Sequence, residues 1–270
     1  MQKKIDLVNG PVLSSLTRLA VPIMATSLIQ MAYNMTDMIW IGRIGSSAVA
    51  SVGAAGMYMW LSNGLAALAK MGGQVNVGHA LGASNSEEAA EYASNALQLT
   101  LTLGIIYGLV CILGAKPLIH FFHLNQAQVI RDAIYYLEIT CGLVLFSFLN
   151  QTYTGLFTAI GNSRPVFLAT TTGLVVNIIL DPVLIFGIGP FPELGVRGAA
   201  AATVTAQALV SLLFFKAVLR EKVLFPHLRL WVLVPVKVWR EIVRIGVPSA
   251  VQNLIYAGIS MILTRLITGW

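Results

Sequence analysis

The sequence predicts an all-α, polytopic membrane protein, and three observations lead to that fold class. Of the 270 residues, 57% are hydrophobic and only 10% are charged, whereas a soluble domain carries about 25% charged residues. Seven apolar stretches reach the length of about 20 residues that a membrane-spanning helix needs. Glycine, proline and charged residues gather between these stretches, as expected of the connections between helices.

The seven predicted spans cover residues 13–40, 49–77, 92–114, 132–158, 164–188, 198–219 and 242–267. Ser84 and Glu87 have the spacing of a capping box and predict the start of the third helix. Residues 236–243 combine charged side chains with Val, Trp and Ile, which is typical of an amphipathic helix on the membrane surface. We therefore expect three regions: a six-helix transmembrane lobe over 1–219, a cytoplasmic connection with the amphipathic helix over 220–241, and the first helix of a second lobe over 242–270.

The distribution of lysine and arginine predicts the orientation, because cytoplasmic connections carry an excess of both. With a cytoplasmic N-terminus, twelve of the 17 lysines and arginines lie on the inner side and five on the outer side: Arg43, Lys116, Arg131, Arg197 and Arg265. We predict a multi-pass protein of the cell (inner or plasma) membrane, in contact with membrane lipids. The basic residues form no stripe with aromatics, so nucleic acid is not an expected partner. Lys70, near the inner end of its span, is expected to extend its amine to the interface.

A weak internal repeat relates the seventh span to the first. Arg18-Leu19-Ala20-Val21-Pro22 parallels Arg244-Ile245-Gly246-Val247-Pro248 at the start of each helix. Transporters are often built from such repeats. One repeat is complete at six spans and the next breaks off at Trp270, so we expect a little more than half of a twelve-span protein, with a missing second lobe as partner.

Two aspartates, Asp37 and Asp181, lie inside apolar spans. A carboxylate at the centre of a bilayer costs about 2.5–3.5 kcal/mol on insertion scales, and such residues usually mark an ion, proton or substrate pathway. Each aspartate shares a helix face with further small or polar residues, at spacings of three or four. These residues are Ser27, Gln30 and Asn34 in the first span, and Thr170, Gly173 and Asn177 in the fifth.

These groups are predicted to meet at one depth. Asp37 lies about 28 Å past Arg18, and Asp181 about 26 Å past Arg164, at 1.5 Å per helical residue. Tyr136 and Thr203 lie within a turn or two of the outer starts of their helices. All four residues therefore belong to the outer half of the membrane and can line one pocket.

The chemistry of this pocket follows from its two carboxylates, which repel each other at low dielectric. Protonation, a bound Na⁺ or an organic cation would relieve that repulsion, so ion and cargo can compete. We expect the Na⁺ ligands to be Asp37, Asp181, Asn177 and Thr203, and no cofactor besides the coupling ion, H⁺ or Na⁺. Pro182 can kink its helix and free a carbonyl for a cation. For Thr140, Ser147 and Thr170 we favour helix packing instead.

A set of motifs runs along essentially the whole chain: Pro22, Gln30, Tyr33-Asn34-x-x-Asp37, Gly42-Arg43, Gly45, Gly82-Ala83, Gly161-Asn162, Pro165, Asn177-x-x-x-Asp181-Pro182, Gly195-Val196-Arg197-Gly198-Ala199-Ala200-x-Ala202-Thr203 and Ile245-Gly246-Val247-Pro248. In these motifs the sequence resembles the multidrug and toxic compound extrusion (MATE) transporters. The acidic Asn177…Asp181-Pro182 motif is similar to that of the DinF-like branch.

The resemblance implies twelve helices in two six-helix lobes, and secondary active multidrug efflux: export of cationic amphipathic compounds by antiport with H⁺ or Na⁺. It implies a cation and substrate cavity in the N-terminal lobe, and no enzymatic activity. The residues that match the family's cavity are Gln30, Asp37, Tyr136, Asn177, Asp181, Ala199 and Thr203, to which Asn34 is added from its helix face.

Three alternatives stay open at this point. A flippase for lipid-linked saccharides, from the same superfamily, should have a cationic cavity, whereas this one is acidic. An intramembrane aspartyl protease also needs two buried aspartates, but Asp181 follows Ile178-Ile179-Leu180 rather than the Gly-x-Gly that such enzymes carry. The third alternative is an inactive remnant of a truncated gene, which a genuine stop codon directly after Trp270 would favour.

Overall fold

The computed structural model describes residues 12–221 and 236–268, and within them it contains nine α-helices and no strand. The helices are α1 (Val12–Ile44), α2 (Ser46–Gly82), α3 (Ser86–Leu113), α4 (Ala115–His120), α5 (Ala127–Thr140), α6 (Leu145–Ala159), α7 (Arg164–Phe186), α8 (Val196–Arg220) and α9 (Val236–Thr268). This confirms the predicted all-α class.

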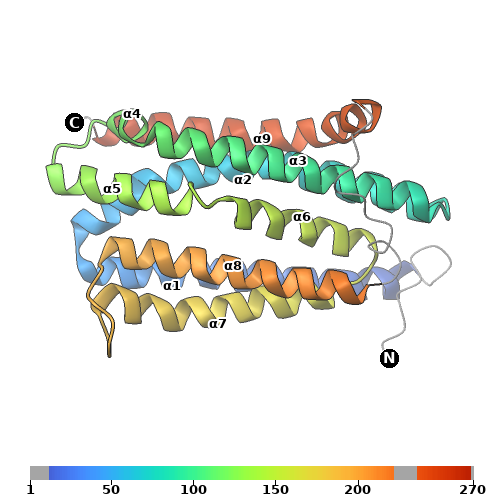
Figure 1. The fold of residues 1–270 in the computed structure, drawn as a ribbon, viewed down its shortest axis with the longest axis horizontal. Helices are drawn as coiled ribbons and strands as arrows, with labels where there is room; N and C mark the ends of the chain where they lie inside the picture. Colours follow the sequence, from blue (N-terminus) through green and yellow to red (C-terminus); the bar gives the residue numbers. More distant parts are fainter. Residues whose placement is uncertain (1–11, 222–235, 269–270) are drawn as a thin grey trace.

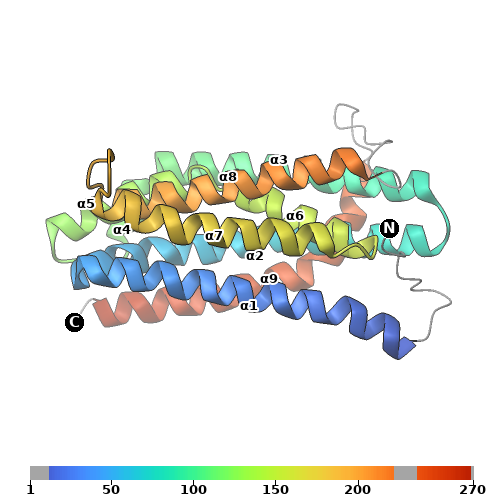
Figure 2. The same cartoon turned by 90° about the horizontal axis from the view of Figure 1, so that it is seen from below.

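The long helices lie side by side along one common axis and alternate in direction (Figure 1). One end of the bundle holds the start of α1 and the connections from α2 to α3 and from α6 to α7. α2 lies at the centre and packs against α9, α3, α6 and α5. α1 and α9 lie along the lower edge in Figure 2, and α1 makes most of its contacts with α7. Other helices therefore cover only part of the α1 surface, and site residues on α1 can be either covered or exposed.

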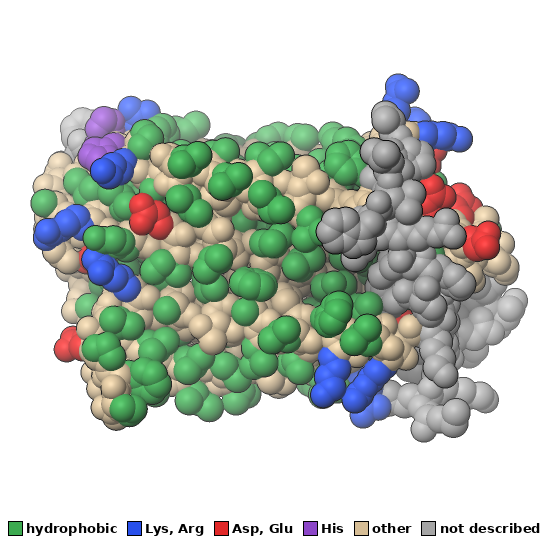
Figure 3. Space-filling view, in the orientation of Figure 1, with side chains coloured by type: hydrophobic (Ala, Val, Ile, Leu, Met, Phe, Trp, Pro, Cys, Tyr) green, Lys and Arg blue, Asp and Glu red, His purple; other side chains and the backbone are tan. Residues whose placement is uncertain are grey.

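The surface fits a membrane setting. On the face in Figure 3, hydrophobic side chains cover the middle of the bundle, and charged side chains gather toward the two ends. Four helices among the described residues, α3, α7, α8 and α9, are long and apolar enough to cross a membrane, and α5 with α6 forms a fifth span. α1 and α2 have 33 and 37 residues, but Ser, Thr, Gly and Ala dilute their apolar character.

The fourth predicted span is broken rather than continuous. α5 ends at Thr140, α6 begins at Leu145, and their axes differ by 47°. Close packing accounts for the break, because a Cβ on Gly108 of α3 would lie 2.8 Å from the Gly142 carbonyl oxygen. Glycines on both sides let the backbone of the break approach α3 where a regular helix with side chains could not.

The α2–α9 contact also depends on glycines. A Cβ on Gly72 would overlap the Ile242 carbonyl, and one on Gly246 would overlap the Leu68 carbonyl. Small residues that let backbones touch are a common means of helix association in membranes, where the hydrophobic effect supplies no drive.

Two local predictions were wrong. The residue that caps α3 is Asn85, whose Oδ1 accepts from the Glu88 backbone N–H at 3.2 Å, and not Ser84. Ser84 instead has a φ of 62° in the preceding turn. Residues 236–243 form the first turns of α9 and are not a separate surface helix. The rest of the predicted connection, residues 222–235, lies outside the described residues.

Candidate functional site

Three helices bring the predicted acidic residues and their polar neighbours together. α7 carries Asn177 and Asp181, both fully buried, and Asn177 Nδ2 donates to Asp181 Oδ1 at 3.1 Å. The two residues are four apart, so their side chains lie on one face of the helix. α1 contributes the half-buried Asp37, and α8 contributes Thr203, which is buried. α7 packs against both α1 and α8, which explains why groups distant in sequence meet here.

The oxygens of this cluster are largely unpaired. Asp37 Oδ1, Asn177 Oδ1, Asp181 Oδ2 and Thr203 Oγ1 are all buried and have no hydrogen-bond partner among the described residues. Buried polar atoms in folded proteins are nearly always hydrogen-bonded, so each exception needs an explanation. Four such oxygens on three neighbouring helices form the kind of oxygen-rich environment in which a proton or a hard cation is stabilised.

The two carboxyl groups lie close enough for the charge of Asp37 to act on Asp181. Like charges at this range in a low-dielectric interior repel strongly, and a shared proton or a cation between them removes the repulsion. The arrangement is therefore one that can exchange a small ion for another positive group. Within the part of the chain that the structure describes, no three His, Cys, Asp or Glu residues form a metal-binding group.

Two tyrosines border the carboxylates, and sequence reasoning assigned only one of them to the site. Tyr136 of α5 is buried and lies near Asp37 and Asp181, as predicted. Tyr33 of α1 also lies near both aspartates, and its buried hydroxyl has no hydrogen-bond partner. Its hydroxyl approaches that of Thr203 without the geometry of a hydrogen bond. The available signal was its position four residues before Asp37, on the same helix face.

The remaining predicted residues lie outside the buried cluster. Gln30 and Asn34 are exposed on α1, and Gln30 Nε2 donates to Asn34 Oδ1 at 3.5 Å. Their separation from the cluster follows from the position of α1 at the edge of the bundle (Figure 2). Ala199 is fully buried and belongs to the hydrophobic core, where its small side chain forms part of a wall and offers no ligand.

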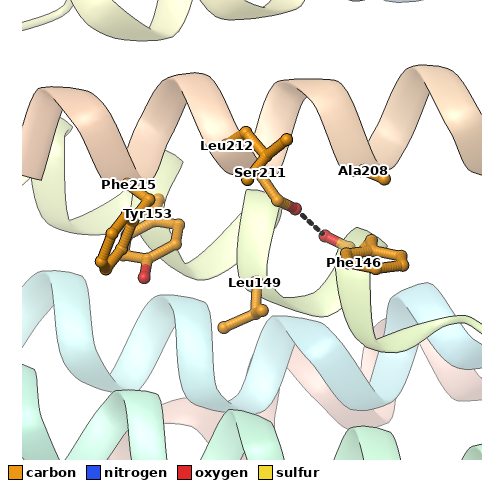
Figure 4. A pocket seen from close by; sticks show the side chains of 7 residues that line it. All are labelled: Phe146, Leu149, Tyr153, Ala208, Ser211, Leu212 and Phe215. Carbon is orange, nitrogen blue, oxygen red and sulfur yellow. Dashed lines mark hydrogen bonds between the residues drawn. The ribbon is translucent and has the colours of Figure 1, made fainter.

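A second concave region lies between α6 and α8 and has a different character. This pocket of about 310 Å³ is lined by the residues in Figure 4: Phe146, Leu149, Tyr153, Ala208, Ser211, Leu212 and Phe215. The Ser211 hydroxyl is close to the Phe146 carbonyl, at 3.3 Å, and to Asn150 Oδ1, at 2.7 Å. No charged side chain lines this pocket, so it is not a candidate for the ion site.

Comparisons with known proteins place the chain in a family. The MatE family model matches residues 22–183, which is more than half of the chain. A probable multidrug resistance protein NorM of Thermotoga maritima is 31% identical over 250 residues, which cover 90% of this chain and 52% of that protein. An FAD transporter of Shewanella oneidensis is 27% identical and is matched over 94% of this chain and 56% of its own length. The chain thus spans about half the length of the curated relatives it matches.

The fold has counterparts among solved structures. A multidrug resistance MATE family transporter of the MOP superfamily, in its outward-facing conformation, superimposes with a TM-score of 0.83 at 26% identity. The match covers 94% of this chain and 55% of that transporter. Together with the family model, which includes α1, α2 and the Asn177–Asp181 motif, these similarities establish that the chain belongs to the MatE family of membrane transporters.

Proposed function

We propose that this chain forms the ion-coupling lobe of a secondary active multidrug exporter, which exchanges cationic amphipathic compounds for H⁺ or Na⁺. The observation that carries the proposal is the cluster of unpaired buried oxygens around Asp37, Asn177, Asp181 and Thr203. The multidrug names of several relatives support the class of activity. Since another relative is named as an FAD transporter, the identity of the cargo is part of the proposal.

In this proposal the ion binds at the inward-facing oxygens of the cluster. Asn177 holds one oxygen of Asp181 by its amide, which leaves Oδ2 for a proton or Na⁺. Asp37 is half-buried and shares its face of α1 with the exposed Gln30 and Asn34. Organic cargo entering along that face would compete with the ion for Asp37. Ion and cargo then exclude each other through electrostatics, which is what antiport requires.

The proposed transport cycle belongs to a two-lobe assembly. Alternating access in such transporters arises from the movement of one repeat against another around a shared site. α1 to α8 supply one lobe and α9 supplies the first helix of the next, so the second lobe is a proposed partner. We place the assembly in the cell membrane with the N-terminus in the cytoplasm, on the basis of the lysine and arginine distribution. The flippase alternative calls for a cationic cavity, and no lysine or arginine belongs to the described oxygen cluster.

The test is ethidium efflux from vesicles containing the protein, driven in turn by an imposed H⁺ or Na⁺ gradient. Asp181→Asn removes the carboxylate from the cluster and should abolish gradient-driven efflux. Asp132→Asn is the matched control, because Asp132 lies near the start of α5 and pairs with Gln128 rather than with the cluster. Efflux that is lost in the first variant and kept in the second supports the site. Equal efflux from the parent protein and both variants would overturn it.

A further inference from the structure

Lys70 stands apart from the other cations of this chain. Among the lysine and arginine side chains that the structure describes, it alone is not exposed. The others lie at the ends of the bundle or on its surface. Lys70 lies in α2, about 36 Å past Ser46 and about 18 Å before Gly82. An ionisable side chain inside a membrane span is a functional candidate by default.

The charge of Lys70 has no counterpart nearby. No hydrogen bond, ion pair or charged neighbour of its amine is found among the described residues. Its backbone and stem pack over Gly155, which is four residues, or about 6 Å, from the end of α6. Asp181 lies about 26 Å from the same end of the bundle, measured along α7. The two carboxylates are therefore about 20 Å away along the axis, too far to neutralise the amine.

The surroundings of Lys70 are rich in uncommitted donors. Asn63, Lys70 and Gln74 are spaced seven and four apart, so they share one face of α2. Asn63 Oδ1 accepts from Gln151 Nε2 at 2.9 Å, which leaves the amide N–H groups of Asn63 unassigned. Gln74 lies beside Gly155 and has no hydrogen bond within the described chain. Amide N–H groups on either side of an ammonium suit the oxygens of a carboxylate or phosphate.

The absence of a side chain at position 155 lets α6 pack closely against the backbone and stem of Lys70. A Cβ on Gly155 would lie 3.0 Å from the Lys70 carbonyl oxygen and 3.1 Å from Lys70 Cγ. Snorkelling alone, which the sequence suggested, accounts for a lysine that reaches the interface. It does not account for a half-buried lysine that shares its helix face with two amide residues, Asn63 and Gln74.

We propose that Lys70, together with Asn63 and Gln74, forms an anion-binding subsite in the inner half of the lobe, which takes the carboxylate or phosphate group of an amphipathic cargo. This inference rests on the proposed function and extends it. The lobe then carries two sites of opposite charge at different depths: the acidic cluster toward one end of the bundle and Lys70 toward the other. Cargo with an anionic group is held at Lys70, away from the carboxylates that would repel it.

The test compares two dyes that differ at one group. Rhodamine 6G is a cationic ethyl ester, and rhodamine 19 is its free acid, which adds a carboxylate to the same ring system. Binding of each dye to the detergent-solubilised full chain is followed by fluorescence anisotropy. Lys70→Gln should weaken rhodamine 19 binding about tenfold, the value of one charge-assisted hydrogen bond, and leave rhodamine 6G binding unchanged. Lys70→Arg should restore the preference, because it keeps the charge.

Lys216→Gln is the matched control, since Lys216 is an exposed cation near the same end of the bundle. Unchanged rhodamine 19 binding in Lys70→Gln would overturn the subsite, as would an equal loss for both dyes or an equal effect of Lys216→Gln. A different result would contradict the proposed cation site at the acidic cluster. If the parent protein does not bind rhodamine 6G, that site is contradicted, whereas rhodamine 19 binding that depends on Lys70 still supports the anion subsite.

Discussion

The contact between α2 and α9 gives a stability prediction that follows directly from the structure. In Gly72→Ala, the new methyl group would overlap the carbonyl of Ile242, as well as the Cγ2 of its side chain. A side chain can rotate away, but the carbonyl belongs to the backbone of α9. The two helices must therefore separate along this contact, which also opens the packing around the fully buried Ile242.

The expected magnitude comes from comparing Gly72 with Gly78 on the same helix. A methyl group at Gly78 meets nothing within 4 Å, so Gly78→Ala should be neutral or stabilising by up to about 1 kcal/mol. Gly72→Ala should destabilise by about 1–3 kcal/mol through overpacking. The difference between the two variants, about 1–4 kcal/mol, is the quantity to measure, because both replace glycine by alanine within one helix.

Unfolding by sodium dodecyl sulfate in mixed micelles, followed by circular dichroism, gives both free energies of unfolding. Truncation of the Ile242 side chain should not rescue Gly72→Ala, since the overlap involves the carbonyl. Equal stabilities for Gly72→Ala and Gly78→Ala would refute the close backbone contact between α2 and α9.

Three further predictions concern the site and the core. Tyr33→Phe should reduce Na⁺- or H⁺-driven efflux several-fold without lowering stability, because its hydroxyl makes no hydrogen bond; paired efflux and unfolding measurements check both halves. Asp37→Asn should abolish coupled efflux while the protein still inserts into the membrane, and unchanged transport would remove Asp37 from the site. Thr152→Val deletes the 2.7 Å hydrogen bond to Thr100 between α6 and α3 and should cost about 0.6 kcal/mol, a typical value for such bonds in membranes, in the same unfolding assay.

Much of the fold could be predicted from the sequence because membrane helices can be recognised by the length and apolar composition of a stretch. The helical class and the order of the long helices follow from apolar runs and their polar connections, since a lipid environment leaves backbone groups no other means of pairing. Asp37, Asn177, Asp181 and Thr203 were predicted to meet from helix faces and depth alone. In the structure Asn177 lies one turn before Asp181 on α7, and the neighbouring helices α1 and α8 contribute Asp37 and Thr203.

Other features depended on contacts that no single span encodes. The break between α5 and α6 arises where Gly142 meets Gly108 of another helix. Gln30 and Asn34 have the same spacing pattern as Asp37, yet they are exposed because the neighbours of α1 cover only part of it. Tyr33 belongs to the site because its hydroxyl is buried beside the carboxylates. The sequence alone does not single it out, since tyrosines are common in membrane spans.

The sequence by itself determined that this is a helical membrane protein and predicted two intramembrane carboxylates at similar depth, because hydropathy and the 1.5 Å helical rise act locally along the chain. Only the tertiary structure decided which polar atoms are left without partners. Whether an oxygen is paired or an amine is neutralised depends on the side chains that other helices bring to it. Lys70 illustrates the point, since its place near the end of a span suggests an interfacial lysine, whereas the structure packs its half-buried stem against Gly155 and brings no acid among the described residues to its amine.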